Sequence, residues 1–377
     1  MPTTPVHETN GSKEETNHRS FQRKNPRFLG CLLAFLLAVV LILPLEILDI
    51  VQKNQSFWIQ LYGSKDVGGS NWCEAIDADL TQFIIEPWNS RSDYAFMLWG
   101  CFLLVLGICD ALDNNDNDNE HILASCEEED EEDEDEEEDE KTCQTVPNPL
   151  LRYPRITWVN GIFNLLHGLG SFWNHACECS NGGTADVSGM LAVTSFPLLY
   201  VPVQLLTFPW RRKPPLFNLI LSLVPPIGQT LFFLLVWLDI LPATETFTIV
   251  MGCTLAILPL SFIYLYRWRN NNKRPQREQH QYLHHRLRLC FFPLGLVCFF
   301  LGFAAWQLDV DGIWCFQTGI LKVLQGHAVW HLFTALALVC VYWIYRSEQL
   351  TLVTSTVVVV DDQEEDPTPL PLPLSDV

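Results

Sequence analysis

Residues 320–345, ILKVLQGHAVWHLFTALALVCVYWIY, decide the fold class of this chain. The segment carries one charged residue, Lys322, and is long enough for an α-helix to cross a bilayer, which takes about 20 apolar residues. It also holds two histidines spaced four positions apart, His327 and His331. Two titratable rings on one face of an apolar helix predict a membrane protein with a polar site inside its helix bundle.

Long apolar runs recur along the rest of the chain. The sequence has 377 residues, is 49% hydrophobic, and concentrates its apolar residues in runs that are nearly free of charge. This pattern is typical of an integral membrane protein. We interpret the first run as a retained helix rather than a cleaved signal sequence, because no small-residue cleavage pattern follows it directly. We therefore predict eight spans, at residues 28–50, 90–109, 156–176, 186–208, 216–238, 246–266, 289–306 and 320–345.

The net charge of −21 arises mainly from one segment, EEEDEEDEDEEEDE at residues 127–140. A block of like charges repels itself and cannot form a core. We expect residues 110–150 to form a disordered acidic insert that solvates the surface of the protein. We also expect a disordered basic arm at residues 1–27 and a tail at 346–377, which is disordered from Val357 onward.

The basic residues predict the orientation in the membrane. If the N-terminus is cytoplasmic, eight spans leave only Lys53, Lys65, Arg91 and Lys322 of the 23 Lys and Arg on the exoplasmic side. The positive-inside rule favours this arrangement. The arm 1–27, the acidic insert and the tail are then cytoplasmic.

Five polar residues lie at the exoplasmic ends of three predicted spans. Ser171 and His175 are near the end of the third span, Asp186 opens the fourth, and His327 and His331 lie in the first turns of the eighth. Charge and chemistry thus place these residues at the same end of the bundle. We expect them to converge on one site.

The histidines predict a zinc site of the catalytic kind. His327 and His331 share a helix face, and His175 would complete a set of three that leaves one position for water. Asp186 could then act as general base, and Ser171 could donate a hydrogen bond to a developing oxyanion. We assign His167, further along the third span, to a hydrogen bond between helices. Cys177 and Cys179, which follow His175 closely, leave an alternative metal or redox site open.

Three segments carry a resemblance to a known family. They are GLGSFWNHACECSNGGTADVSGM (168–190), GHAVWHLF (326–333) and NWCEAIDADLTQFIIEPWNSRSDYAF (71–96). Their motifs and spacing resemble the alkaline ceramidase family, over residues 72–345 without the acidic insert. The resemblance implies a seven-helix domain, here within 51–345, and makes the helix at 28–50 an addition. We expect neither this helix nor the acidic insert to touch the site.

The same resemblance implies roles for individual residues. It implies zinc ligands at His175, His327 and His331, with Ser171 and Asp186 as catalytic partners. For calcium it implies the Trp72 carbonyl and the Glu74 and Glu86 carboxylates. This sequence departs from the family where Asn71 and Ile76 replace an Asp and an Asn, where the spacing to Glu86 is one residue longer, and where Asp93 replaces an Asn. Asp77 or Asp79 would compensate for the missing oxygen ligands.

Cys73 and Cys315 both fall on the predicted exoplasmic side. The resemblance implies that segment 71–96, which contains Cys73, caps the bundle. An oxidising lumen would allow a disulfide between Cys73 and Cys315 that clamps this cap over the site. We predict this pairing.

The sequence thus predicts an all-α membrane protein with a seven-helix bundle preceded by one extra helix. The function that we expect is zinc-dependent hydrolysis of the N-acyl amide bond of ceramide or a related sphingolipid. We expect a lipid substrate and the bilayer as partners, and no nucleic acid. The location would be the endoplasmic reticulum or Golgi membrane, with the site toward the lumen. Two alternatives stay open: an ester hydrolase that remodels lipids, and a seven-helix receptor with a structural zinc.

Overall fold

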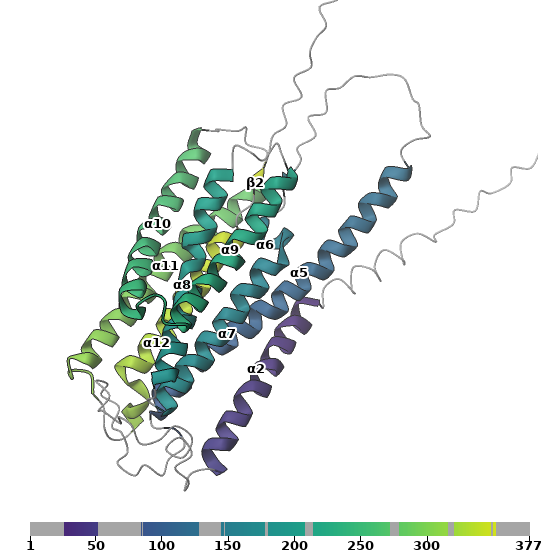
Figure 1. The fold of residues 1–377 in the computed structure, drawn as a ribbon. Helices are drawn as coiled ribbons and strands as arrows, with labels where there is room; N and C mark the ends of the chain where they lie inside the picture. Colours follow the sequence, from purple (N-terminus) through teal and green to yellow (C-terminus); the bar gives the residue numbers. More distant parts are fainter. Residues whose placement is uncertain are drawn as a thin grey trace, which may run out of the picture.

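The computed structural model describes residues 26–51, 84, 86–127, 145–146, 148–177, 180–207, 214–271, 279–315, 320–347 and 350–351. Within these ranges the chain forms eight helices of 21 residues or more (Figure 1). Their bounds are α2 Pro26–Val51, α5 Tyr94–Glu127, α7 Pro154–Cys177, α8 Ser180–Thr207, α9 Pro214–Trp237, α10 Ala243–Asn271, α11 Gln279–Val310 and α12 Gly326–Arg346. The shorter elements are α4 Pro87–Ser92, α6 Pro149–Arg152 and the 3₁₀ turn Ile320–Leu324.

The helices have the length and apolar composition that a bilayer requires. Five stretches of the described helices are long and apolar enough to cross a membrane: Leu29–Val51, Pro87–Asn114, Ser180–Val203, Cys290–Val310 and Gly326–Arg346. Shorter apolar helical stretches cover Ser222–Trp237 and Glu245–Leu260. The protein is therefore an all-helical, multi-pass membrane protein. Each of the eight predicted spans overlaps one of the long helices, but α7, α9 and α10 are not among the five candidate spans, so the count of eight stays a prediction.

Close helix contacts bring the site helices together. α7 packs along α8 on one side and α5 on the other, and α12 packs along α11. At Gly189 of α8, an added Cβ would lie 2.5 Å from the His167 Cα, and at Gly170 of α7 it would lie 2.7 Å from the backbone of Ala185. Only glycine permits such an approach. α7 and α8 therefore lie close enough for Asp186 to reach the polar side of α7.

The opposite end of the bundle is closed by a buried ion pair. Arg346, at the end of α12, donates to both oxygens of Asp110 in α5, at 2.7 Å and 2.6 Å. Asn148 donates to the Tyr345 and Arg346 carbonyls and so satisfies the last turn of α12. An aromatic core that includes Tyr200 and Tyr342 lies beside this pair.

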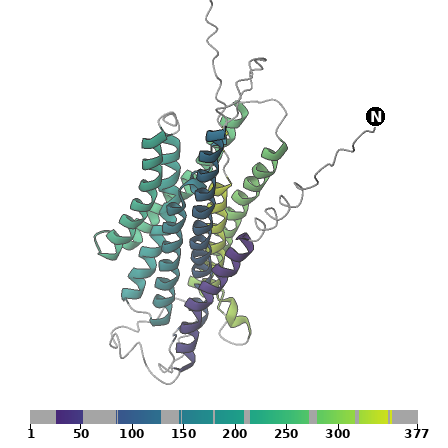
Figure 2. The same cartoon turned by 90° about the vertical axis from the view of Figure 1, so that its right-hand side faces the viewer.

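The extra helix α2 lies on the outside of the bundle. Figures 1 and 2 show it in purple against α5, away from α8, α9 and α10. Leu33, Leu36 and Val40 are among its exposed apolar side chains. Such a surface is suited to lipid contact on one side and helix contact on the other.

Both ends of the predicted disordered insert, residues 110–150, differ from the sequence prediction. We expected residues 110–150 to be disordered, but α5 continues to Glu127, and α6 follows after the two-residue strand β1, Thr145–Val146. Once a helix is formed, each added residue gains a hydrogen bond without a new nucleation cost, so a polar extension can persist beyond the apolar run. β1 pairs antiparallel with β2, Leu350–Thr351, which lies in the predicted tail. The all-acid segment 128–140, the arm before residue 26 and the tail beyond residue 351 lie outside the described residues.

Candidate metal centre

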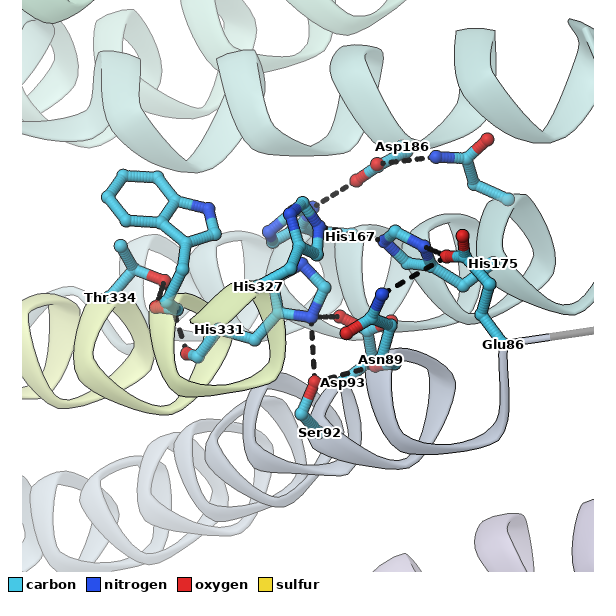
Figure 3. Close-up of polar contacts among 12 residues, drawn as sticks. Glu86, Asn89, Ser92, Asp93, His167, His175, Asp186, His327, His331 and Thr334 are labelled. Carbon is cyan, nitrogen blue, oxygen red and sulfur yellow. Dashed lines mark hydrogen bonds and ion pairs between the residues drawn. The ribbon is translucent and has the colours of Figure 1, made fainter. Parts of the chain in front are cut away.

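Four helices meet at the candidate site: the short helix α4, the end of α7, the beginning of α8 and the beginning of α12 (Figure 3). α7 carries Ser171 and His175, α8 carries Asp186, and α12 carries His327 and His331. The structure therefore brings the five predicted residues to one end of the bundle. The up-and-down order of the helices makes this possible, because α7 ends where α8 and α12 begin.

His175, His327 and His331 form a buried cluster. Their side chains belong to residues that are 2%, 6% and 4% exposed. One ring nitrogen from each lies within 4.8 Å of the others, and the Nε2 atoms of His175 and His327 are 3.1 Å apart. Three buried imidazoles with ring nitrogens this close together are suited to a cation held between them.

Two carboxylates hold the far sides of these rings. Glu86 Oε2 lies 2.5 Å from His175 Nδ1, and Asp93 Oδ1 lies 3.0 Å from His331 Nδ1. Ser92 Oγ lies 2.8 Å from the same His331 nitrogen. Glu86 accepts from Nδ1 of His175. Ser92, whose hydroxyl hydrogen goes to the Asn89 carbonyl, accepts from Nδ1 of His331. An acceptor at Nδ1 fixes the tautomer that leaves Nε2 free to bind a metal, as is usual for histidine ligands of zinc. The donor set therefore fits a zinc ion.

The short helix α4 positions these partners. Pro87 occupies its first turn, where a missing N–H costs nothing, and Glu86 directly precedes it. Asn89 donates to Glu86 Oε2 at 3.2 Å, and Ser92 donates to the Asn89 carbonyl at 2.6 Å. Glu86, Asn89 and Asp93 are fully buried. We call α4 with the flanking Glu86 and Asp93 the polar shelf, because its side chains lie against the rings of His175 and His331.

Asp186 lies across the α7–α8 contact. Its Oδ2 accepts from Asn174 Nδ2 at 3.2 Å, and its Oδ1 lies 3.5 Å from His167 Nδ1. It is close enough to His175 for an electrostatic interaction. His167 thus lies beside a carboxylate of a neighbouring helix, but its Nδ1 has no hydrogen-bond partner among the described residues, so the predicted hydrogen bond stays a prediction.

Ser171 is buried one turn before His175. Its side chain is fully buried, and its Oγ has no hydrogen-bond partner among the described residues. Most buried hydroxyls are hydrogen-bonded. This hydroxyl is therefore available to donate to a substrate atom.

The predicted calcium ligands are described only in part. Trp72 and Glu74 lie outside the described residues, so the calcium site stays a prediction. Glu86 is described, and its Oε2 lies against His175 and Asn89. Its contact with a candidate zinc ligand was not expected from the sequence.

Two described cysteines on the predicted exoplasmic side take part in disulfides. Cys177 and Cys315 are both disulfide-bonded. Cys73 and Cys179 lie outside the described residues, so the predicted Cys73–Cys315 pairing stays a prediction. Because Cys177 is disulfide-bonded, it offers no thiolate for the alternative metal site that the sequence left open.

Sequence reasoning missed the residues that orient the histidines. Asn89, Ser92 and Asp93 received no role, although the run NSRSD opens an apolar span at the end where the histidines lie. Polar side chains in that position are a usable signal of a buried partner. The partner itself comes from α12, more than 200 positions away, and no local pattern identifies it.

Comparison with known proteins identifies the family of this chain. No curated protein matches the chain. The family model described as Ceramidase matches residues 67–358, a range that contains all five converging residues and most of the chain. Membership implies a hydrolase that acts on amide bonds, with a lipid of the ceramide class as substrate. Since the match extends from before α4 to beyond α12, the chain belongs to the Ceramidase family.

Proposed function

We propose that this protein is a zinc-dependent amidohydrolase that cleaves the N-acyl bond of ceramide or a related sphingolipid. The products are a sphingoid base and a free fatty acid. The observation that carries the proposal is the buried cluster of His175, His327 and His331, with carboxylates behind two of the three rings. Family membership supplies the substrate class.

The nitrogen geometry supports zinc. Two ligand atoms at about 2.0–2.1 Å from a tetrahedral zinc ion lie about 3.3 Å apart. The Nε2 atoms of His175 and His327 are separated by 3.1 Å, which is close to that value. Three neutral imidazoles are the ligand set of a hydrolytic zinc, and they leave one position for water or substrate.

The residues around the histidines carry the chemical roles. Zinc, when bound, polarises a carbonyl oxygen and makes water more acidic. Asp186 takes a proton from the attacking water and passes it to the leaving nitrogen of the sphingoid base. Asn174 and His167 hold the two oxygens of this carboxylate in place. Ser171 Oγ donates to the oxygen that gains negative charge as the amide carbon becomes tetrahedral.

We further propose that the membrane domain has seven spans, α5 and α7 to α12, with α2 as an eighth. The positive-inside rule then places the metal centre toward the exoplasmic side. In the endoplasmic reticulum or Golgi this is the lumen. A substrate that resides in the bilayer reaches such a site without leaving the membrane.

Purified protein and defined lipids test the proposal. Wild-type protein should release labelled fatty acid from N-acylsphingosine, and the His331→Ala variant should not. Thr334→Val is a matched control, because Thr334 lies one turn further along α12 and its hydroxyl donates to the Trp330 and His331 carbonyls of its own helix. Release from glycerophospholipid esters but not from ceramide would favour a lipid-remodelling hydrolase. Full activity of His331→Ala would exclude the metal mechanism.

A further inference from the structure

The extra helix α2 contacts the shelf that orients the metal ligands. Arg91, in α4, donates from Nε and Nη2 to the two oxygens of Glu46, at 3.0 Å and 3.2 Å. Arg91 Nη2 also donates to Asp49 Oδ2 at 2.9 Å. Tyr94 adds a hydrogen bond to Glu46 at 2.8 Å. We call Glu46, Asp49 and Arg91 the α2 clamp.

The two carboxylates of the clamp are not needed for membrane anchoring. Glu46 and Asp49 are the only acidic residues in α2, whose apolar stretch is otherwise the most hydrophobic of the five candidate spans. Carboxylates in such a helix are costly unless they are paired. Arg91 pairs with both, and the fork with Glu46 has the bidentate geometry of the stronger charge-assisted hydrogen bonds. The pairing therefore explains why α2 carries these two charges.

Arg91 and the ligand partners lie on the same short helix. Asn89 donates to Glu86, which in turn contacts His175. Ser92 and the following Asp93 contact His331. Arg91, on the same short helix, contacts α2. The shelf is thus held between the metal ligands and α2. A shift of α4 would move the carboxylates behind two of the three rings.

Apolar packing also connects α2 with the helices that carry the site. Ile42 and Leu45 of α2 pack against a buried cluster that includes Ile84, Phe172 and Ala176. Ala176 directly follows the candidate ligand His175. α2 thus supports the site through α4 and through the end of α7.

We propose that α2 is a working part of the catalytic domain, and that Arg91 is a positioning residue through which Glu46 and Asp49 hold the metal ligands in place. This inference rests on the proposed metal centre. It goes beyond our expectation that the extra helix does not touch the site, because α2 would act on the site through α4, and α2 lies outside the residues that the family model matches. Through the clamp, the orientation of His175 and His331 depends on the placement of α2.

Zinc retention tests the proposal separately from catalysis. The double variant Glu46→Gln/Asp49→Asn keeps the size of both side chains and removes their charge. We expect its bound zinc to dissociate into excess chelator about 10- to 100-fold faster than from wild-type protein, the range seen when partners of metal ligands are lost. Hydrolysis should fall through kcat rather than KM, because the clamp contacts α4, which carries the partners of the metal ligands, and not the histidines themselves.

Two further variants separate positioning from general stability. Asp110→Asn breaks the other bidentate arginine pair, at the opposite end of the bundle, and should lower thermal stability while leaving the zinc dissociation rate unchanged. Arg91→Glu should lose zinc quickly, and its combination with Glu46→Arg and Asp49→Asn should restore retention by reversing the pair.

The outcomes distinguish this inference from the proposed function. If wild-type protein hydrolyses ceramide and the clamp variants retain zinc as wild type does, the clamp has no positioning role and the proposed function stands. If wild-type protein binds zinc without hydrolysing ceramide, and the clamp variants lose zinc quickly, the clamp is correct and the substrate is wrong. If Asp110→Asn loses zinc as quickly as the clamp variants do, the faster zinc dissociation reflects lower overall stability, and the proposal is overturned.

Discussion

At the scale of single residues, the most specific prediction concerns the activity of a variant at Ser171. Its hydroxyl is buried and has no hydrogen-bond partner among the described residues, so its removal breaks no internal bond. We predict that Ser171→Ala lowers kcat by about 10²- to 10³-fold, as loss of an oxyanion donor does. The thermal stability of the protein should hardly change.

Ser195 is the matched control for Ser171. It is equally buried, but its Oγ donates to the Ala192 carbonyl in the same helix. Ser195→Ala should therefore leave kcat near the wild-type value. Similar activity losses in the two variants would argue against a catalytic role for Ser171.

Asp93 and Glu86 make a different prediction, because they act behind the ligands. Asp93→Asn and Glu86→Gln keep shape but weaken the contacts to His331 and His175. We predict zinc affinity about 10- to 100-fold lower than wild type, measured by competition with a coloured chelator. Unchanged affinity in both variants would show that these carboxylates do not orient ligands.

At the scale of elements, the contact between α7 and α8 decides whether Asp186 reaches the site. Gly189 lies so close to His167 that a Cβ would come within 2.5 Å of its Cα. Gly189→Ala should push the helices apart, cost about 1–3 kcal/mol of stability, and lower activity at least tenfold. Thermal unfolding and ceramide turnover of the purified variant measure both effects.

Gly252 provides the control for Gly189. It also lies inside a helix, α10, but nothing lies within 4 Å of an added Cβ. Gly252→Ala should therefore be neutral or slightly stabilising, because alanine is the better helix former. A Gly189→Ala variant that behaves like Gly252→Ala would contradict the close packing of α7 on α8.

Much of the element pattern was predictable, because hydrocarbon requires long apolar helices and the sequence shows them directly. The meeting of His175 with His327 and His331 was also predictable, since span order and charge place all three at one end. The partners on α4 were not, because Asp93 and Ser92 meet His331 only through tertiary packing. The same reason hid the pairing of Arg91 with Glu46, which lies 45 positions away.

At the scale of the whole molecule, orientation in the membrane is the main prediction. From the distribution of Lys and Arg we predict that the acidic segment 128–140 lies in the cytoplasm and the segment 55–70 on the exoplasmic side. Epitope tags can be inserted in these two segments, in separate variants that keep activity. The two tags should differ in their accessibility to antibody when only the plasma membrane is permeabilised. Antibody should reach only the tag in the acidic segment while internal membranes stay intact. Access to the other tag under that condition would reverse the orientation.

Dependence of ceramide hydrolysis on the metal tests the central claim most directly. Purified protein should be stripped of metal, then assayed with labelled ceramide while zinc is returned in steps and bound zinc is counted. We predict that activity disappears on stripping and returns in proportion to zinc, reaching its maximum at one ion per chain. Hydrolysis that persists in metal-free protein would contradict the account.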